Sequence, residues 1–242
     1  MDKGILFISA TILLSLGITG SGFFIGNGYY QTHMNNRSVI VKGLAEMPVK
    51  ADLAIWNIKF QTIGNELTET QSKINNHKDL IIAFLNKNGF RSSEITIGWI
   101  NTNDLDANPY REKTAGQPRF ILTQNIYVRS NQVNSVAHTS EKIGELVGQG
   151  IVFANTEYEQ PISYLFTGLN QIKPVMLEEA TQNARQAATE FAKNSQAVVG
   201  KIRKANQGVF SILPQDAAPG VSETAQIDKT VRVVSTVEYF LE

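Results

Sequence analysis

Residues 51–62, ADLAIWNIKFQT, alternate between two sets of side chains. In an extended chain one set faces one side: Ala54, Trp56, Ile58 and Phe60. The other set faces the opposite side: Ile55, Asn57, Lys59 and Gln61. A period of two with one apolar face predicts a half-buried β-strand.

Further strands are predicted around this one. Residues 119–130 alternate in the same way, with Phe120, Leu122, Gln124, Ile126 and Val128 on one face. Residues 38–42, 94–101, 201–213 and 229–241 are also predicted as strands, and residues 151–166 as extended chain broken near Pro161. Gln207 and Gly208 indicate a tight bend or bulge.

Three helices are predicted between these strands. Residues 65–88 begin at a capping Asn65 and end at Gly89, with an apolar stripe of Leu67, Ile74, Ile81, Leu85 and Phe84. A second helix begins at Ser130 or Asn131 and ends by Gly148 to Gly150. The third covers residues 171–197 with Pro174 in its first turn and an inner stripe of Met176, Ala180, Ala184, Ala188 and Phe191.

Paired strands that alternate with helices predict an α+β fold, a mostly antiparallel mixed sheet with helices packed on one face. The composition shows no break after residue 38. We therefore expect one domain over residues 38–242, joined by a tether at 31–37 to an N-terminal segment at 1–30.

The N-terminal segment is apolar. Asp2 and Lys3 are the only charged side chains before Arg37, and residues 4–25 contain nothing more polar than Ser or Thr. As a helix, those residues would span about 33 Å, against about 30 Å of hydrocarbon in a bilayer. This predicts an uncleaved transmembrane helix. A cleaved signal peptide, with Thr19 and Ser21 at its cleavage site, is the alternative.

Glycines cluster in residues 20–30, GSGFFIGNGYY. A dinucleotide-binding loop requires G-x-G-x-x-G after a strand, but Ile25 occupies the third glycine position. Two small-residue pairs, Gly22 with Gly26 and Gly17 with Ser21, have the spacing that brings membrane helices together. The alternative is that glycine is simply common in membrane helices.

Two tyrosines follow the glycines. Tyr29 and Tyr30 lie where side chains at a membrane interface are expected. Lys3 favours a cytosolic amino terminus, whereas Arg37 and Lys42 flank the other end of the span, so the charge rule for orientation is almost balanced.

The chemistry-bearing residues form no recognised catalytic pattern. The net charge of zero gives no electrostatic reason to bind nucleic acid, and the absence of cysteine excludes disulfides and thiolate sites. The polar loop with Asp104 and Asp106 lacks the other ligands of a calcium loop. Other candidates have no partner at a useful spacing: His33, His77, His138, Glu178 and Glu179. We predict no catalytic, cofactor or metal residue, and Trp56 and Trp99 are interpreted as core or interface residues.

Several blocks resemble the SIMPL-domain family of bacterial envelope proteins, a domain of unknown function. They are VKGLAEMPVKADLAIW (41–56), FTGLNQIKPVMLEEATQNARQAATEFAKNS (166–195), GKIRKANQGVFSI (200–212) and VRVVSTVEYFL (231–241). The resemblance implies a periplasmic α+β domain. Some relatives are linked to oxidative or envelope stress, and some assemble into large ring-like homo-oligomers. The family supplies no catalytic residues.

These observations together predict a single-pass inner-membrane protein with its folded domain in the periplasm. We expect a non-enzymatic interaction module that forms a ring or cage-like homo-oligomer through exposed strands and the alanine-rich helix surface. A periplasmic small-molecule binding module and an enzyme with an unrecognised site are the alternatives.

Overall fold

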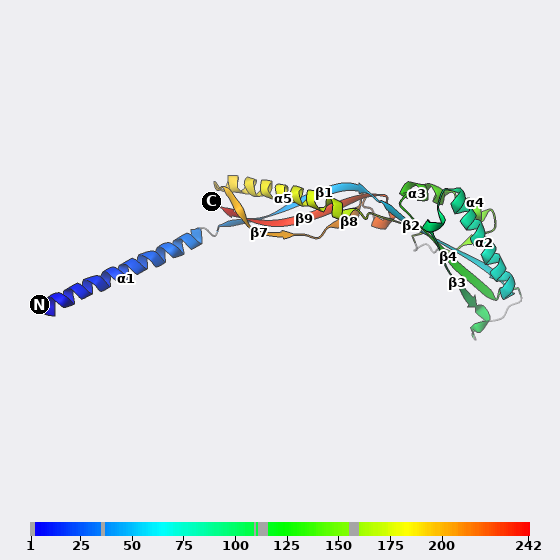
Figure 1. Cartoon of the computed structure of the whole chain (residues 1–242), viewed down its shortest axis with the longest axis horizontal. Helices are drawn as coiled ribbons and strands as arrows, with labels where there is room; N and C mark the ends of the chain where they lie inside the picture. The colour runs from blue at the N-terminus through cyan, green and yellow to red at the C-terminus, as the bar shows by residue number, and fades with distance from the viewer. Residues whose placement is uncertain (1–2, 35–36, 109, 111–115, 155–159) are drawn as a thin grey trace. The chain divides into compact units, whose positions relative to one another are not determined.

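The computed structural model of the chain describes residues 3–34, 37–108, 110, 116–154 and 160–242. Within the first helix, α1 (Lys3–Met34), it describes the side chains of residues 14–29. The chain forms two compact units (Figure 1). Unit 1 comprises residues 1–46, 173–211 and 232–242, and unit 2 comprises residues 47–172 and 212–231.

Unit 2 is built on a five-stranded sheet around β2 (Leu53–Gly64). β2 pairs with β4 (Phe120–Ser130), β5 (Val152–Phe153) and β6 (Ile162–Leu165), and β4 pairs with β3 (Ile95–Asp104). All these pairs are antiparallel. The order β3-β4-β2-β5 leaves β3 at one edge.

One face of this sheet is buried, as the alternation predicts. Trp56, Ile58 and Phe60 of β2 and Ile126 of β4 are at most 2% exposed. They form a core with residues of α2 (Leu67–Lys87), α3 (Val133–Glu141) and α4 (Gly144–Val147), so these helices cover that face. The other face carries the polar set of side chains.

The start of α2 differs from the prediction. Glu66, not Asn65, is the N-cap residue, and its side chain makes no capping bond. The Asn65 side chain instead accepts a hydrogen bond from the Arg119 backbone N–H, at 3.2 Å. Leu67 therefore falls in the first turn and is 42% exposed. Gly89, with φ of 93°, ends the helix as predicted.

Unit 1 contains α5 (Leu169–Asn194) beside a four-stranded sheet. The order is β1 (Ser38–Lys50), β9 (Asp228–Leu241) and β7 (Val199–Gln207), and β8 (Ser211–Pro214) also pairs with β9. α5 runs along β1 and β9 (Figure 1). β7 and β9 are antiparallel. The second core consists of Val41, Ala184, Ala188, Val237 and Tyr239.

The buried stripe of α5 repeats every four residues: Met176, Ala180, Ala184, Ala188 and Ala192. Phe191 was predicted in this stripe but is 62% exposed. It precedes Ala192 by one residue and so points about 100° away around the helix. Pro174 also lies deeper than predicted, because α5 begins at Leu169 and Pro174 is inside the helix.

The α+β class with antiparallel pairing is confirmed, but the strands form two sheets where one was predicted. β1 extends to Lys50 because Val41, Gly43 and Ala45 continue its buried face with small side chains that the hydrophobic pattern does not reveal. α1 extends to Met34, into the predicted tether. Three short 3₁₀ turns complete the described elements: η1 (Ser92–Glu94), η2 (Leu105–Ala107) and η3 (Glu223–Ala225).

Candidate functional site

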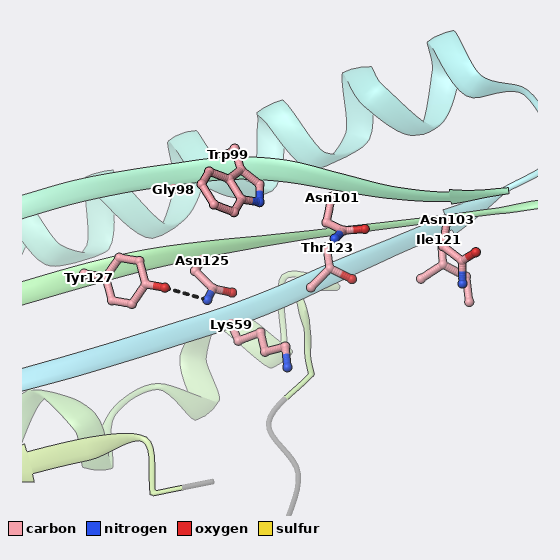
Figure 2. A pocket seen from close by; sticks show the side chains of 9 residues that line it. All are labelled: Lys59, Gly98, Trp99, Asn101, Asn103, Ile121, Thr123, Asn125 and Tyr127. Carbon is pink, nitrogen blue, oxygen red and sulfur yellow. Dashed lines mark hydrogen bonds between the residues drawn. The ribbon is translucent and has the colours of Figure 1, made fainter.

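The solvent face of the unit 2 sheet contains a depression of about 480 Å³ (Figure 2). Its lining comes from three strands: Lys59 of β2; Gly98, Trp99, Asn101 and Asn103 of β3; and Ile121, Thr123, Asn125 and Tyr127 of β4. Trp99 and Tyr127 lie toward one end, and Asn103 and Ile121 lie at the other. The site is therefore an open depression that combines amide and hydroxyl groups with apolar surface and has aromatic rings at one end.

A β-bulge presents Trp99 at this surface. The register between β3 and β4 shifts between Ile97 and Ile100, so Gly98 and Trp99 lie within the irregularity. Such a bulge interrupts the ladder and redirects side chains. The Trp99 side chain is 87% exposed, whereas Trp56 is 2% exposed and belongs to the core.

Gln124 supports the bulge from the core side of the sheet. Its side chain is 5% exposed, and its Nε2 donates a hydrogen bond of 2.8 Å to the Gly98 carbonyl. Its Oε1 is buried and has no hydrogen-bond partner. An unsatisfied buried acceptor costs on the order of 1–3 kcal/mol. The core therefore contains an unpaired polar oxygen on Gln124, the same residue whose Nε2 binds the bulge.

Gly98 and Asn125 fix the neighbouring aromatic ring. A Cβ added to Gly98 would lie 3.1 Å from the Asn125 carbonyl oxygen and 3.6 Å from Cε2 of Tyr127. Asn125 Nδ2 donates to the Tyr127 hydroxyl at 2.9 Å, as drawn in Figure 2. The missing side chain at position 98 therefore avoids a tight contact with the Asn125 carbonyl oxygen, while the tyrosine ring lies at ordinary contact distance beside the bulge.

The lining is rich in groups that can form hydrogen bonds with a ligand. Its amides and hydroxyls both donate and accept hydrogen bonds, and Lys59 is the one charged residue among the nine. The lining includes neither a carboxylate nor a histidine that could act as a base. An uncharged or weakly anionic ligand fits this composition.

Asp104 and Asp106, the acidic residues predicted in a polar loop, pair with Arg119. Asp104 accepts two hydrogen bonds from the Arg119 guanidinium, at 2.9 Å from Nη2 and 3.1 Å from Nε, and this carboxylate raises the pKa of Arg119. The backbone N–H of Asp106 donates to Asp104 at 3.0 Å. Within the described residues, no group of three or more histidines, cysteines or carboxylates could hold a metal.

The other predicted candidates do not belong to the lining of this depression. His77 is half-buried on α2, and burial lowers its pKa. Glu178 and Glu179 are exposed on α5 in unit 1, and Glu178 accepts a bond of 3.2 Å from Gln182. His138 is 3.6 Å from Glu141 at the protein surface. The His33 side chain lies outside the described residues.

The predicted helix-packing residues lie on α1. A Cβ added to Gly17, Gly22 or Gly26 would meet nothing within 4 Å, and Ser21 donates to the Ile18 carbonyl at 2.9 Å. Tyr29 is 67% exposed. The Tyr30 side chain lies outside the described residues. Among the residues that the structure describes, no helix has both the length and the apolar character needed to span a membrane.

A second surface lies in unit 1, where β7 forms the sheet edge. Residues 201–207 are all exposed, and Ile202 is 47% exposed. A groove of about 380 Å³ separates α5 from this edge. Its lining is Leu177, Glu178, Thr181, Gln182, Arg185, Ile202 and Tyr239. The buried Tyr239 hydroxyl has no hydrogen-bond partner, and burial raises its pKa.

The profile of one protein family, "SIMPL: Protein of unknown function (DUF541)", matches residues 39–239. The chain belongs to the SIMPL family. This confirms the resemblance inferred from the sequence blocks. The SIMPL match includes residues of both compact units and therefore strands of both sheets. No curated protein matches the chain.

Sequence reasoning missed the depression on the SIMPL domain. It interpreted Trp99 as a core or interface residue, because no basic stripe accompanies it. The available signal was the break in alternation within ITIGWIN (95–101), where Gly98 interrupts the period of two. Gly208, where a tight bend or bulge was predicted, lies just after the end of β7 in a stretch without regular structure, and an added Cβ there would lie only 2.1 Å from the Val234 carbonyl oxygen.

Proposed function

We propose that this SIMPL protein is a non-enzymatic interaction module of the bacterial cell envelope, tethered to the inner membrane by α1 and associating with copies of itself. The observation that carries the association is the exposed β7 strand at the edge of the unit 1 sheet. An edge strand offers backbone N–H and C=O groups that can pair with another chain. The envelope-stress role implied by the resemblance is part of this proposal.

The exposed side chains of β7 support an interface at this edge. Ile202 is 47% exposed, and the nearby Val198 and Val209 are 67% and 86% exposed. A second strand laid along β7 would cover apolar surface and also satisfy backbone groups. The alanine-rich surface of α5, predicted to contribute, is unsuitable because Ala180, Ala184 and Ala188 are fully buried within the chain.

The composition of α1 supports the tether. The helix spans 32 residues, and the apolar run of residues 4–25 lies within it. Phe23, Phe24 and Ile25 are each at least 69% exposed, so this helix presents large apolar side chains that the chain itself does not cover. Gly22 and Gly26 would provide a secondary helix–helix contact in the membrane.

Native mass measurement of the full chain in detergent tests the association. Lys204→Pro and Ala205→Pro are made singly, because adjacent backbone N–H groups in a strand point to opposite sides and one of the two faces the free edge. The variant that removes the N–H facing the free edge should remain folded and lose the oligomer. Val147→Ala, which shortens an exposed apolar side chain of α4 in unit 2, is the control and should retain it. A monomeric parent protein would rule out self-association.

Alkaline extraction and protease protection test the tether and its orientation. The full chain should stay with the membrane pellet, and protease added to the periplasmic side should digest the domain. Deletion of residues 1–30 should release the protein. Recovery of the intact chain in the soluble fraction would exclude the tether. Replacing Gly22 and Gly26 by Leu separates the contribution of the helix to association from that of β7.

A second candidate function is ligand binding by the unit 2 domain. The bulged, amide-rich depression around Trp99 favours it, since binding sites combine apolar surface with a few convergent polar groups. Ligand that copurifies with the parent protein and is lost from Trp99→Ala would support this function. Equal copurification with both proteins would argue against the depression as its site.

A further inference from the structure

The geometry points to an oligosaccharide-binding site on the solvent face of β2, β3 and β4, with specificity for uncharged or weakly acidic chains of N-acetylated sugars. The inference goes beyond self-association, since the site lies in unit 2 and the proposed interface is the edge of unit 1. It rests on the position of Trp99, the amides beside it and the near absence of charge.

The aromatic part of the site matches the apolar part of a sugar. A pyranose ring presents a face of C–H groups, which can stack on an indole. Trp99 is 87% exposed and is carried by a bulge on a hydrogen-bonded strand, so its ring is available without rearrangement. Tyr127, 38% exposed and bonded through its hydroxyl to Asn125, adds a second fixed ring.

The polar part of the site matches the edge of a sugar. Asn101 of β3 is directly opposite Thr123 of β4, and Asn103 is opposite Ile121. The site therefore offers amides and a hydroxyl in rows along neighbouring strands, which lie about 4.8 Å apart. A planar amide can donate and accept at once. This suits both the hydroxyls of a sugar and its acetamido group, which carries one donor and one acceptor.

Charge argues against other classes of ligand. A polyphosphate or nucleic-acid chain calls for several cations, but Lys59 is the single cation of the lining. Bare cations would require carboxylates, which the lining does not contain. A protein partner would require a contiguous apolar centre, whereas Trp99 and Ile121 are separated by amides and Thr123 (Figure 2). Lys59 can pair with an isolated carboxylate on an acidic sugar.

The support beneath Trp99 is a second, independent observation. Gln124 occupies a core position, yet it donates its Nε2 hydrogen bond to the bulge carbonyl and leaves Oε1 buried without a partner. A leucine there would suit the apolar core better. Retaining a glutamine makes sense where the bulge, and hence the outward indole, is needed. Gln124 is therefore a positioning residue.

Binding is measured on the full chain in a zwitterionic detergent, because sugar-headed detergents would compete. The probe is a chitin oligosaccharide, and a cello-oligosaccharide of equal length tests the need for acetamido groups. We expect saturable heat by calorimetry and a blue shift of Trp99 emission with the chitin probe. The cello-oligosaccharide should bind about tenfold or more weakly.

Variants assign the binding to this face. Trp99→Ala should weaken binding of the chitin probe by about tenfold or more, and Trp99→Phe should retain part of the affinity. Tyr110→Ala removes another aromatic side chain, 92% exposed but outside the lining, and should leave affinity unchanged. Gln124→Leu should keep the chain folded, reported by an unchanged far-UV circular dichroism spectrum, and weaken binding.

The results separate this proposal from self-association. Trp99→Ala should lose the sugar and keep the oligomer, and the β7 proline variant should do the reverse. Absence of saturable binding to the chitin probe, or equal affinity of parent and Trp99→Ala, would overturn the proposal. Stable capture of a peptide or a second copy at Trp99, with no effect of the sugar, would also overturn it.

Discussion

Replacing Gly43 by alanine tests whether contact between strand and helix backbones holds unit 1 together. A Cβ built on Gly43 would lie 1.8 Å from the Ala180 carbonyl oxygen and 2.6 Å from the Ala184 backbone nitrogen. Both atoms belong to the backbone of α5, so no side-chain rotation can relieve the contact. Since ordinary contact begins at 3.4 Å, β1 and α5 must separate locally by about 1.6 Å (3.4 − 1.8).

The energetic cost follows from what this separation disrupts. Overpacking a well-packed core costs about 1–3 kcal/mol. The Asn183 side chain also donates a 2.8 Å hydrogen bond to the Leu44 carbonyl, and the separation would break it at a further cost of about 1 kcal/mol. We therefore expect Gly43→Ala to destabilise the packing of α5 by about 3 kcal/mol. At 1.4 kcal/mol per factor of ten, this corresponds to roughly 100-fold faster exchange of protected α5 amides.

Hydrogen exchange followed by mass spectrometry measures this effect on peptides from α5. Gly144→Ala is the control, because nothing lies within 4 Å of the added Cβ and alanine favours a helix more than glycine does. This control should not accelerate exchange. If α5 exchanges at the same rate in Gly43→Ala and in the parent protein, the close contact does not determine the stability of unit 1.

Two further predictions concern charged groups in unit 2. Lys229 is fully buried, and its Nζ lies 2.5 Å from both a carboxylate oxygen and the backbone carbonyl oxygen of Glu223. Lys229→Met should lower the free energy of unfolding by about 2 kcal/mol, measured as a lower urea midpoint of Trp56 fluorescence. The double variant Lys229→Met with Glu223→Gln should recover part of this loss, because it no longer leaves a carboxylate unpaired. The Ser130 hydroxyl, followed by the Arg91 backbone N–H, lowers the pKa of Glu94 below its ordinary 4.5. The resulting stabilisation is complete above the unfolded-state pKa of Glu94 and disappears as the pH falls through its lowered folded-state pKa. In urea unfolding, the parent protein should therefore lose more stability on acidification than Glu94→Gln does. An identical pH dependence of the two proteins would contradict the assignment.

The sequence predicts the unit 2 core because large apolar side chains mark its strands. The alternation around Trp56 and Ile126 matches the buried face, and the stripe through Ile74 and Ile81 matches the buried side of α2. Leu67 differs because it is the first residue of the helix, after an N-cap residue, Glu66, whose side chain makes no capping bond. Periodicity identifies the element, whereas the first turn depends on tertiary contacts such as that of Asn65 with Arg119.

Unit 1 was harder to predict because β1 and α5 contribute mainly small residues to its core. The face of β1 that contacts α5 includes Gly43 and Ala45, which carry almost no hydrophobic signal. Close approach of two backbones buries surface without large side chains, so composition does not reveal it. The boundary between the units was equally hidden, because β1 and β9 each continue from one unit into the other and leave no linker.

Gly43 and Gly98 illustrate two different constraints on glycine. At Gly43 the obstructing atoms belong to the backbone of a packed helix, and that contact serves the fold. At Gly98 the nearest atoms are the Asn125 carbonyl and the edge of the Tyr127 ring, both at the solvent face, while a buried glutamine holds the opposite side of the bulge. The fold requires neither the exposed indole nor the unpaired Gln124 oxygen. The unpaired oxygen lowers stability, and the bulge that Gln124 holds from the core side carries the indole on the solvent face. Binding at the solvent face is the simplest physical reason for keeping this arrangement.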